Sequence, residues 1–373
     1  MKKNHSKFLS FILLSAIFSG TVFFKVLTDH TVTDGPYVLY QNGKVYAKYV
    51  VQQADGSFQV KCDSVAESMK DQLTLQVNTD ELGKTFSVRL KEKITDEKAE
   101  YRKVSKQFVI SDLEGNFKAF RKLLLAGGVI DSDLNWTFGT GHLVLVGDLF
   151  DRGNHVAEIL WLIYSLEDKA KAAGGYVHYV LGNHEIMNLN GDLRYLNEKY
   201  IKSAIALHEN YVNLYGENSE LGRWLRSKNI VEKVGNVLYA HAGISQILNE
   251  IDINASGINK TARPWYADST ENYKTELQEL LMHEWGPLWY RGYYKGNPKA
   301  SMAQIDSTLA KFDVRHIITG HTIIADTISV LYDGKLFDTD IHHAKGKSEA
   351  IFIEDGKFFS VLPTGEKKLL YSR

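Results

Sequence analysis

Side chains able to bind a metal ion follow five short apolar segments of this sequence. Each block combines oxygen or nitrogen donors with glycine or another small residue. The blocks are Asp112-Leu-Glu114-Gly-Asn116, Gly147-Asp148-Leu-Phe-Asp151-Arg152-Gly153, Gly182-Asn183-His184-Glu185, His241-Ala-Gly243 and Gly320-His321-Thr322. Carboxylate, amide and imidazole groups are the usual protein ligands of divalent cations. The pattern therefore predicts a metal centre.

The segments before these blocks have the β-branched composition of buried strands. They are residues 108–111, 143–146, 176–181, 237–240 and 316–319. Helical spacing of apolar residues separates the first three, and Gly127-Gly128 and Gly174-Gly175 end the two helices. The distances in sequence from Asp112 to Asp148 and from Asp148 to Asn183 suit one strand–helix–strand unit each. Because the carboxyl ends of strands meet at the ligand crevice of α/β folds, we expect the blocks to lie together.

Such a donor set suits hydrolysis of a phosphate ester. That reaction needs a nucleophile at neutral pH and positive charge around the phosphoryl oxygens. Two metal ions roughly 3.5–4 Å apart supply both, since they lower the pKa of a bridging water and bind the substrate. One carboxylate must bridge the ions, and Asp148 is the natural candidate because it lies in the middle of the strand series.

The composition excludes several other classes of protein. The 373 residues are 44% hydrophobic and 24% charged, which suffices for a full globular core. The sequence has 44 Lys and Arg residues against 45 Asp and Glu residues, a net charge of −1. It therefore lacks the excess of positive charge with which a protein attracts nucleic acid. Cys62 is the single cysteine, so an intrachain disulfide and a cysteine-rich zinc site are excluded. We expect Cys62 to be a small buried hydrophobe.

Three segments follow one another along the chain. Residues 1–30 read as a signal peptide or membrane anchor, with a basic start and an apolar run at 8–24. This predicts export across a membrane, to the periplasm or to the membrane surface, with membrane contact only through residues 8–24. Residues 31–100 form a small β-rich module with a hairpin at Asn42-Gly43. Residues 101–373 form the domain that carries the donors, with helical caps at 191–230 and 245–312.

The motifs GDLFDRG, GNHE, HAG and GHT resemble the signature blocks of calcineurin-like metallophosphoesterases, in their phosphoprotein-phosphatase branch. GNHEIMNLNGDLRYL and GPLWYRGYY are similar to the Shewanella-like subgroup of that branch. The resemblance covers about residues 106–345. It implies an α/β (α+β) fold, a β-sandwich of mixed sheets flanked by helices.

The resemblance also implies roles for named residues. One metal ion would be held by Asp112, Glu114 and Asp148. The other would be held by Asp148, Asn183, His241 and His321. His184 would be the general acid, oriented by Asp151, and Arg152 and Arg291 would bind the phosphate.

Glu114 departs from the resemblance, because the family usually has histidine there. A carboxylate gives the first site oxygen ligands only, which favours hard ions. We therefore expect two divalent ions, most simply Mn²⁺, with Fe or Mg²⁺ as alternatives. Glu114 also removes one unit of positive charge from the site.

The predicted function is a metal-dependent phosphatase that acts on a small phosphoester or on phosphorylated Ser, Thr or Tyr of a protein. Two alternatives stay open: a catalytically weak or inactive exported binding module, and a dinucleoside polyphosphate hydrolase. Other residues carry less information. We expect Glu185 to support the site or a turn, and His342 and His343 either to line the site or to form a polar turn. Five aromatic residues could pack around Arg291 or form walls for phosphotyrosine: Trp285, Trp289, Tyr290, Tyr293 and Tyr294.

Overall fold

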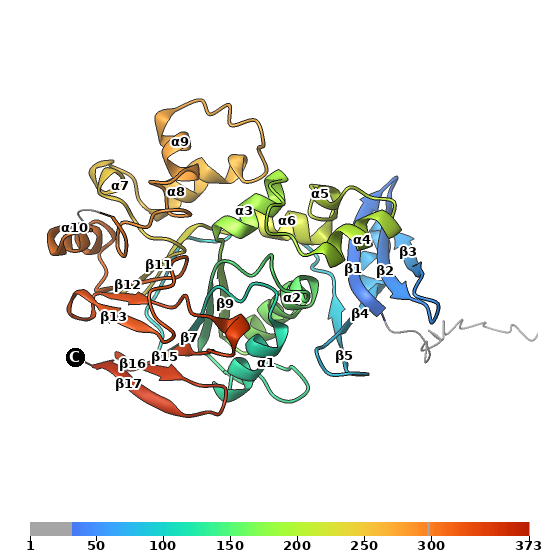
Figure 1. The fold of residues 1–373 in the computed structure, drawn as a ribbon, viewed down its shortest axis with the longest axis horizontal. Coiled ribbons are helices and arrows are strands. Elements are labelled where there is room, and N and C mark those ends of the chain that lie inside the picture. Colours follow the sequence, from blue (N-terminus) through green and yellow to red (C-terminus); the bar gives the residue numbers. More distant parts are fainter. Residues whose placement is uncertain (1–31, 297–298, 373) are drawn as a thin grey trace, which may run out of the picture.

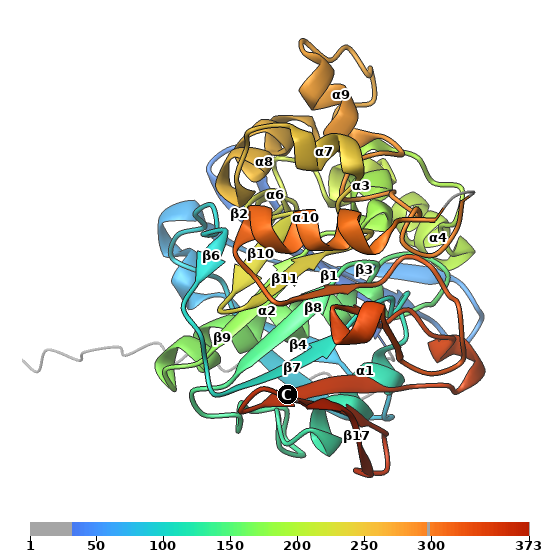
Figure 2. The ribbon, with the colours of Figure 1, turned by 90° about the vertical axis from the view of Figure 1, so that its left-hand side faces the viewer.

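A computed structural model describes residues 32–296 and 299–372. Two six-stranded mixed sheets lie face to face at its centre, with helices on their outer sides (Figures 1 and 2). The sequence-based prediction of a sandwich of mixed sheets flanked by helices is confirmed.

The first sheet has the strand order β17-β16-β15-β7-β8-β9. Its parallel half consists of β7 (Lys106–Ile110), β8 (His142–Val146) and β9 (Tyr176–Val180), connected by helices α1 (Phe117–Ala126) and α2 (Val156–Ala172). Its antiparallel half consists of β15 (Ala350–Glu354), β16 (Lys357–Val361) and β17 (Lys367–Ser372). These bounds match the strand–helix–strand units expected from the sequence.

The second sheet has the strand order β13-β14-β12-β11-β10-β6. Strands β11 (Val237–Ala240), β12 (His316–Thr319) and β14 (Leu336–Asp338) run parallel to one another. Strands β10 (Val231–Val234) and β13 (Ser329–Leu331) pair with them in antiparallel fashion, and β6 (Glu100–Tyr101) closes the far edge. Each sheet thus contributes three parallel strands to the sandwich.

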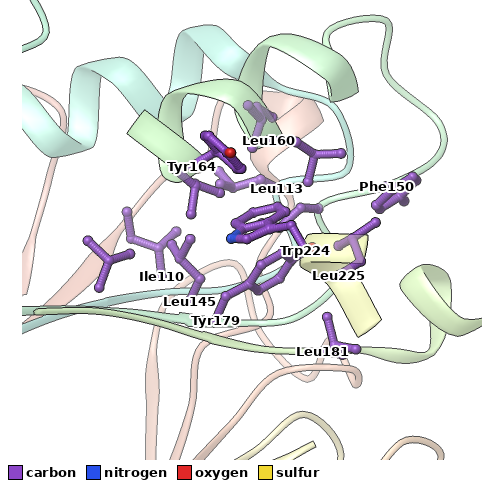
Figure 3. Close-up of a cluster of buried hydrophobic side chains, with 14 of the residues drawn as sticks. Ile110, Leu113, Leu145, Phe150, Leu160, Tyr164, Tyr179, Leu181, Trp224 and Leu225 are labelled. Atoms are coloured by element: carbon purple, nitrogen blue, oxygen red, sulfur yellow. The ribbon is translucent and has the colours of Figure 1, made fainter. Parts of the chain in front are cut away.

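Two apolar layers hold the sandwich together. Valine, isoleucine and aromatic side chains from both sheets fill the space between them, including Val144, Val180, Ile318 and Phe337. On the outer side of the first sheet, α2 and α6 pack on β7, β8 and β9. Figure 3 shows Ile110, Leu145, Leu160, Tyr164, Tyr179, Trp224 and other side chains of this outer layer in contact. The parallel strands are therefore buried on both faces, as their continuous apolar runs require.

The N-terminal segment packs on the same outer layer. It contains a three-stranded sheet of β1 (Val32–Gln41), β2 (Lys44–Gln52) and β3 (Phe58–Ala66), the 3₁₀ helix η1 (Glu67–Gln72), and a hairpin of β4 (Thr74–Asn78) and β5 (Thr85–Arg89). Its buried side chains belong to the same apolar cluster as those of α2. The Trp161 indole donates a hydrogen bond of 2.8 Å to the Pro36 carbonyl, and Tyr40 donates one of 2.5 Å to Glu220. The segment therefore shares its core with the first of the two central sheets.

Short helices cover the edge of the sandwich where the donor blocks lie (Figure 1). The first group leads from the donor edge to the N-terminal sheet and consists of α3 (Asn183–Asn190), α4 (Glu198–Ala206), α5 (Tyr211–Leu214) and α6 (Glu220–Arg226). The second group is α7 (Gln246–Glu250), α8 (Ala255–Ala262), η2 (Arg263–Trp265), α9 (Glu276–Met282) and α10 (Met302–Phe312). Two 3₁₀ turns, η3 (Tyr332–Gly334) and η4 (His343–Lys345), precede and follow β14.

Two further expectations can be compared with the structure. Cys62 is exposed on β3, so the prediction of a buried thiol was wrong. Its strand has only one sheet neighbour, and most of its side chains face solvent. The apolar run at 8–24 lies outside the described residues. Among the residues that are described, no helix has the length and apolar character needed to span a membrane.

Glu158, a buried residue of α2, makes stability depend on pH. Burial raises its pKa from the ordinary 4.5 to about 7, although Lys199 at 3.7 Å opposes the shift. An acid with a raised pKa contributes stability that is complete below pH 4.5 and is lost as pH rises through 7. Between pH 5 and 8 we expect the wild type to lose up to about 3 kcal/mol of stability through Glu158, and Glu158→Gln to be free of this loss. Urea unfolding measures the free energy of unfolding at both pH values, with exposed Glu198→Gln as control. If this free energy changed with pH to the same extent in both variants, the assignment would be contradicted.

Candidate metal centre

Six acidic, amide and histidine side chains follow the carboxyl ends of the six parallel strands. In the first sheet they are Asp112 after β7, Asp148 after β8 and Asn183 after β9. In the second sheet they are His241 after β11, His321 after β12 and Asp340 after β14. Because the two sheets face each other, the donors come from both sides to the same edge. Five of these residues were predicted from the sequence, and Asp340 was not.

Asp148, His241 and His321 form a buried cluster with metal-binding geometry. One ligand atom from each lies within 4.8 Å of the others. The His241 Nε2 atom is 3.1 Å from the Asp148 Oδ2 atom and 3.1 Å from the Asn183 Oδ1 atom. The structure therefore brings together the four residues that the resemblance assigns to the second metal ion.

The hydrogen bonds of the two histidines test whether a cation fits there. The His241 Nδ1 atom lies 2.7 Å from the Val146 carbonyl, so this nitrogen carries the proton in a neutral ring. Its Nε2 lone pair then faces the oxygens of Asp148 and Asn183, an arrangement that a shared cation stabilises. The His321 Nε2 atom likewise lies 3.2 Å from the Trp289 carbonyl, which leaves Nδ1 free to coordinate. The donor set fits a divalent metal ion.

The electrostatics of the cluster show that Asp148 requires a positive charge beside it. Burial would lower the pKa of His241, but the Asp148 carboxylate outweighs it and raises that pKa, so a proton takes the place of a cation here. Burial by itself would raise the pKa of Asp148, but His241 and His184 outweigh it and hold that pKa below its ordinary value. Burial lowers the pKa of His321 well below its usual range, and His241 and Arg291 lower it further. Asp148 is thus an anion beside a neutral imidazole of His321, the protonation states that metal ligands require.

The backbone at the centre is held in an unusual conformation. Six of the residues predicted from the sequence to form the site have positive φ angles: Asp112, Glu114, Asp148, Asp151, Arg152 and His321. Non-glycine residues seldom adopt this conformation, which costs of the order of 1–3 kcal/mol each and is concentrated at functional sites. Glycine is required where the loops meet, since a Cβ atom on Gly182 would collide with the Asp148 carboxylate and one on Gly320 with that of Asp112.

Glu185 holds two of these loops in place. One carboxylate oxygen accepts hydrogen bonds from the backbone amides of Gly182 at 2.6 Å and Asp148 at 2.9 Å. The other accepts from Leu149 at 2.7 Å and Phe150 at 3.3 Å. The side chain is fully buried and does not belong to the ligand cluster. Glu185 therefore supports the site, as its sequence position suggested.

His184 lies beside the metal cluster and is paired with Asp151. The His184 Nδ1 atom is 2.6 Å from the Asp151 Oδ2 atom, and its Nε2 atom is 3.7 Å from the Asp148 Oδ2 atom. The Asn188 amide donates to the other Asp151 oxygen at 2.9 Å. Burial would lower the pKa of His184, but the carboxylates of Asp148 and Asp151 outweigh it and raise that pKa. This is the arrangement of an oriented acid–base histidine.

The residues assigned to the first metal ion are less closely grouped. Asp112 is buried, and its Oδ1 atom accepts a hydrogen bond from the His321 amide at 3.2 Å. Glu114 makes an ion pair with Arg152, the residue that was predicted to bind the phosphate. The Glu114 carboxylate therefore points toward that arginine. Burial and the charges of Asp340 and Asp148 raise the pKa of Asp112 well above its ordinary value. Buried carboxylates that raise one another's pKa are stabilised by a cation, so Asp112, Asp148 and Asp340 also fit a metal ion.

Asp340 is a residue of the site that the sequence analysis missed. It is buried, and burial together with the charge of Asp148 raises its pKa to about 7. The signal was present, since Leu336–Asp338 is a short apolar strand followed by an acid. The sequence analysis considered His342 and His343 as residues that could line the site, but both make other contacts. The His342 Nδ1 atom is 3.1 Å from an Asp326 oxygen, and the His343 Nδ1 atom is 3.1 Å from the Ser348 hydroxyl.

The aromatic residues around Arg291 divide into two groups. Tyr290, Tyr293 and Tyr294 are buried and pack within the cap. Trp285 and Trp289 line a large cavity next to the centre, to which the buried Tyr290 also contributes. Arg291 donates hydrogen bonds to the His321 carbonyl at 2.7 Å and to the Thr322 hydroxyl at 3.0 Å. This places its guanidinium group at the edge of the metal cluster.

Residues 106–325, more than half of the sequence, match the calcineurin-like phosphoesterase family. The chain belongs to that family. A structure of a cold-active protein-tyrosine phosphatase from a psychrophilic Shewanella species superposes on this phosphoesterase with a TM-score of 0.81. The identity is 34%, over 91% of this chain and 99% of that chain.

Two curated relatives of this phosphoesterase are similar over shorter regions. Shewanella-like protein phosphatase 1 of Plasmodium berghei is 28% identical over 225 residues, which are 58% of this chain and 61% of that protein. Shewanella-like protein phosphatase 2 of Arabidopsis thaliana is 39% identical over 99 residues, 26% of this chain and 25% of that protein. The family predicted from the signature blocks is confirmed.

Replacing the Glu185 carboxylate should loosen the metal centre of this phosphoesterase. In Glu185→Gln an amide NH₂ group would face backbone N–H donors, so two of the four hydrogen bonds are lost. We expect a loss of about 2–3 kcal/mol in stability and roughly 10–100-fold weaker metal binding. Unfolding and metal titration measure these effects, with exposed Glu276→Gln as control. Unchanged metal affinity would show that Glu185 does not position Asp148.

Glu114 can be tested for metal coordination separately from its ion pair. If it coordinates the first ion, Glu114→Ala should weaken the binding of one Mn²⁺ ion by at least about tenfold and leave the other unchanged. Glu114→His should shift the preference of that site toward softer ions such as Zn²⁺. Arg152→Ala is the matched control, because it breaks the same ion pair without removing a donor. Identical Mn²⁺ titrations for wild type and Glu114→Ala would exclude Glu114 as a ligand.

Proposed function

We propose that this chain is a metal-dependent phosphatase that hydrolyses phosphomonoesters, with phosphorylated side chains of proteins as its substrate class. The observation that supports this most strongly is the buried cluster of Asp148, His241 and His321 with the His184–Asp151 pair beside it. Metal ligands and an oriented proton donor are the two requirements of the reaction. The protein phosphatases among its relatives support the choice of substrate class.

Two divalent ions, for which we propose Mn²⁺, would activate water and offset the charge of the phosphoryl group when bound. Asp148, Asn183, His241 and His321 would hold one of them. Asp112, Glu114 and Asp148 would hold the other, with oxygen atoms only, which is the reason for proposing a hard ion.

The remaining residues act on the phosphate and on the leaving group. Arg152 lies beside Glu114 and Arg291 beside His321, and their planar guanidinium groups match phosphate oxygens. His184 carries the proton that the leaving oxygen requires, since its raised pKa keeps the ring partly protonated near neutral pH. Asp151, at 2.6 Å, fixes the ring so that its Nε2 atom faces the centre.

The alternative of an inactive binding module receives less support. An inactive binding module would have no need of the His184–Asp151–Asn188 arrangement, which serves proton transfer and is fully buried.

The proposal of export to the periplasm or membrane rests on residues 1–30 alone, and intact-mass measurement of the protein from its host would test it.

The full chain purified without metal should hydrolyse para-nitrophenyl phosphate only after Mn²⁺ is added. We expect His184→Ala to keep its metal ions and to lose roughly 10²–10⁴-fold in kcat on a phosphoserine peptide. The loss on para-nitrophenyl phosphate should be smaller, because nitrophenolate leaves without a proton. His342→Ala is the control, since that imidazole pairs with Asp326. The absence of turnover with Mn²⁺, Mg²⁺, Fe²⁺ or Ni²⁺ would refute the proposed function.

A further inference from the structure

A groove of about 1070 Å³ runs from the metal centre along the cap helices. Its walls come from α3, from the segment 282–296 and from the start of α7 and α10. Figure 1 shows these elements grouped on the side of the sandwich where α9 projects. The volume exceeds the space that a single phosphorylated side chain would occupy, and it reaches the upper end of the range for ligand pockets. The groove can therefore accommodate more of a substrate than its phosphate.

The groove is continuous with the site where the phosphate would bind. Trp289 lines it, and the ring of Trp289 meets the His321 ring edge-on, with centroids 6.0 Å apart. Arg291 also lines it and donates hydrogen bonds to the His321 carbonyl and the Thr322 hydroxyl. A molecule whose phosphate lies between Arg291 and the metal cluster would have its next atoms in the groove.

Aromatic and apolar side chains form the exposed walls of this groove. Three rings meet in a row, tilted or edge-on to one another: Trp265 and Tyr273 with centroids 5.0 Å apart, and Tyr273 and His283 with centroids 5.3 Å apart. Trp285 is 48% exposed and Ile247 is 45% exposed, although both are large apolar side chains. Exposed apolar surface of this kind, and tryptophan in particular, marks protein recognition sites.

The charges at the rim distinguish between possible occupants. Asp192 and Arg194 neutralise each other through hydrogen bonds of 2.7–3.0 Å. Glu271 and Glu284 balance Lys295 and Lys299, and Arg291 adds one positive charge at the end of the groove next to the metal cluster. Away from Arg291 the charge of the rim is balanced, and such a rim does not attract the further phosphates of a polyanion such as a dinucleoside polyphosphate. It suits a polypeptide, whose backbone is neutral and whose apolar side chains can pack on the rings.

We infer that this groove binds the polypeptide segment that flanks the phosphorylated residue of a protein substrate, and that it selects segments with apolar or aromatic side chains. The inference rests on the proposed phosphatase function and adds a specificity determinant to it. The rings of Trp285 and the Trp265–Tyr273 pair supply rigid contact surface, and Ile247 completes the apolar lining.

Two pairs of phosphopeptides test the inference on the full chain loaded with Mn²⁺. One pair carries phosphotyrosine and the other phosphoserine, and in each pair the flanking residues are either Leu and Phe or Gly and Ser. The wild type should show at least a tenfold lower KM for the apolar flanks. Trp285→Ala and Ile247→Ala should remove most of that preference by raising KM, with kcat little changed. Both variants should hydrolyse para-nitrophenyl phosphate like the wild type, because that substrate has no flanking residues to contact Trp285 or Ile247.

Ile201→Ala is the matched control, since Ile201 on α4 is also 45% exposed and does not line the groove. Equal KM values for apolar and polar flanks would overturn the inference, while turnover of para-nitrophenyl phosphate would still support the phosphatase function. Weaker inhibition of Trp285→Ala by diadenosine tetraphosphate, with unchanged peptide KM, would assign the groove to nucleotides and overturn it as well. A wild-type dimer that Trp285→Ala dissociates, again with unchanged peptide KM, would show the groove to be a contact between copies.

Discussion

The negative charge of Asp148, buried where the two sheets meet, is the constraint on which the active site depends. A carboxylate withdrawn from water is costly unless cations or hydrogen-bond donors compensate it. Here His241 lies at 3.1 Å, the His184 amide donates at 3.0 Å, and the cluster offers space for a metal ion. Each of these groups sits on a different strand end or loop. The strand order of both sheets therefore brings together the groups that offset the negative charge of Asp148.

The same requirement explains the conformation of the loops. To bring backbone and side-chain donors around Asp148, the chain must turn sharply directly after each strand. The positive φ angles of Asp112, Asp148 and His321 are the result. Glu185 stabilises two of these turns through four backbone amides, and a Cβ atom at Gly182 would occupy the space of the Asp148 carboxylate. The rigid core behind β7, β8 and β9, to which the N-terminal segment contributes, keeps the strained turns from relaxing.

The sequence was sufficient for those parts of the fold and site that depend on local pattern. Apolar runs followed by donors identified Asp112, Asp148, Asn183, His241 and His321, because a ligand must directly follow its strand. Long-range packing was not visible in the same way. Tyr40 and Pro36 hydrogen-bond to Glu220 and Trp161, far away in sequence, and nothing in residues 31–100 indicates that partner. Asp340 was missed because its strand is short and the neighbouring His342-His343 pair resembled a ligand set more strongly.

Asp340 and Glu114 change the charge balance that a phosphate would meet. The centre contains four carboxylates, Asp112, Glu114, Asp148 and Asp340, and two guanidinium groups, of which Arg152 is already paired with Glu114. Burial, together with the charges of neighbouring acids, raises the pKa values of Asp112 and Asp340, so without a cation these two acids keep their protons to higher pH than an exposed aspartate would. Divalent cations would take the place of those protons, keep the carboxylates ionised as ligands and add positive charge, so we expect them to be needed for the substrate to bind as well as for the bond to be cleaved.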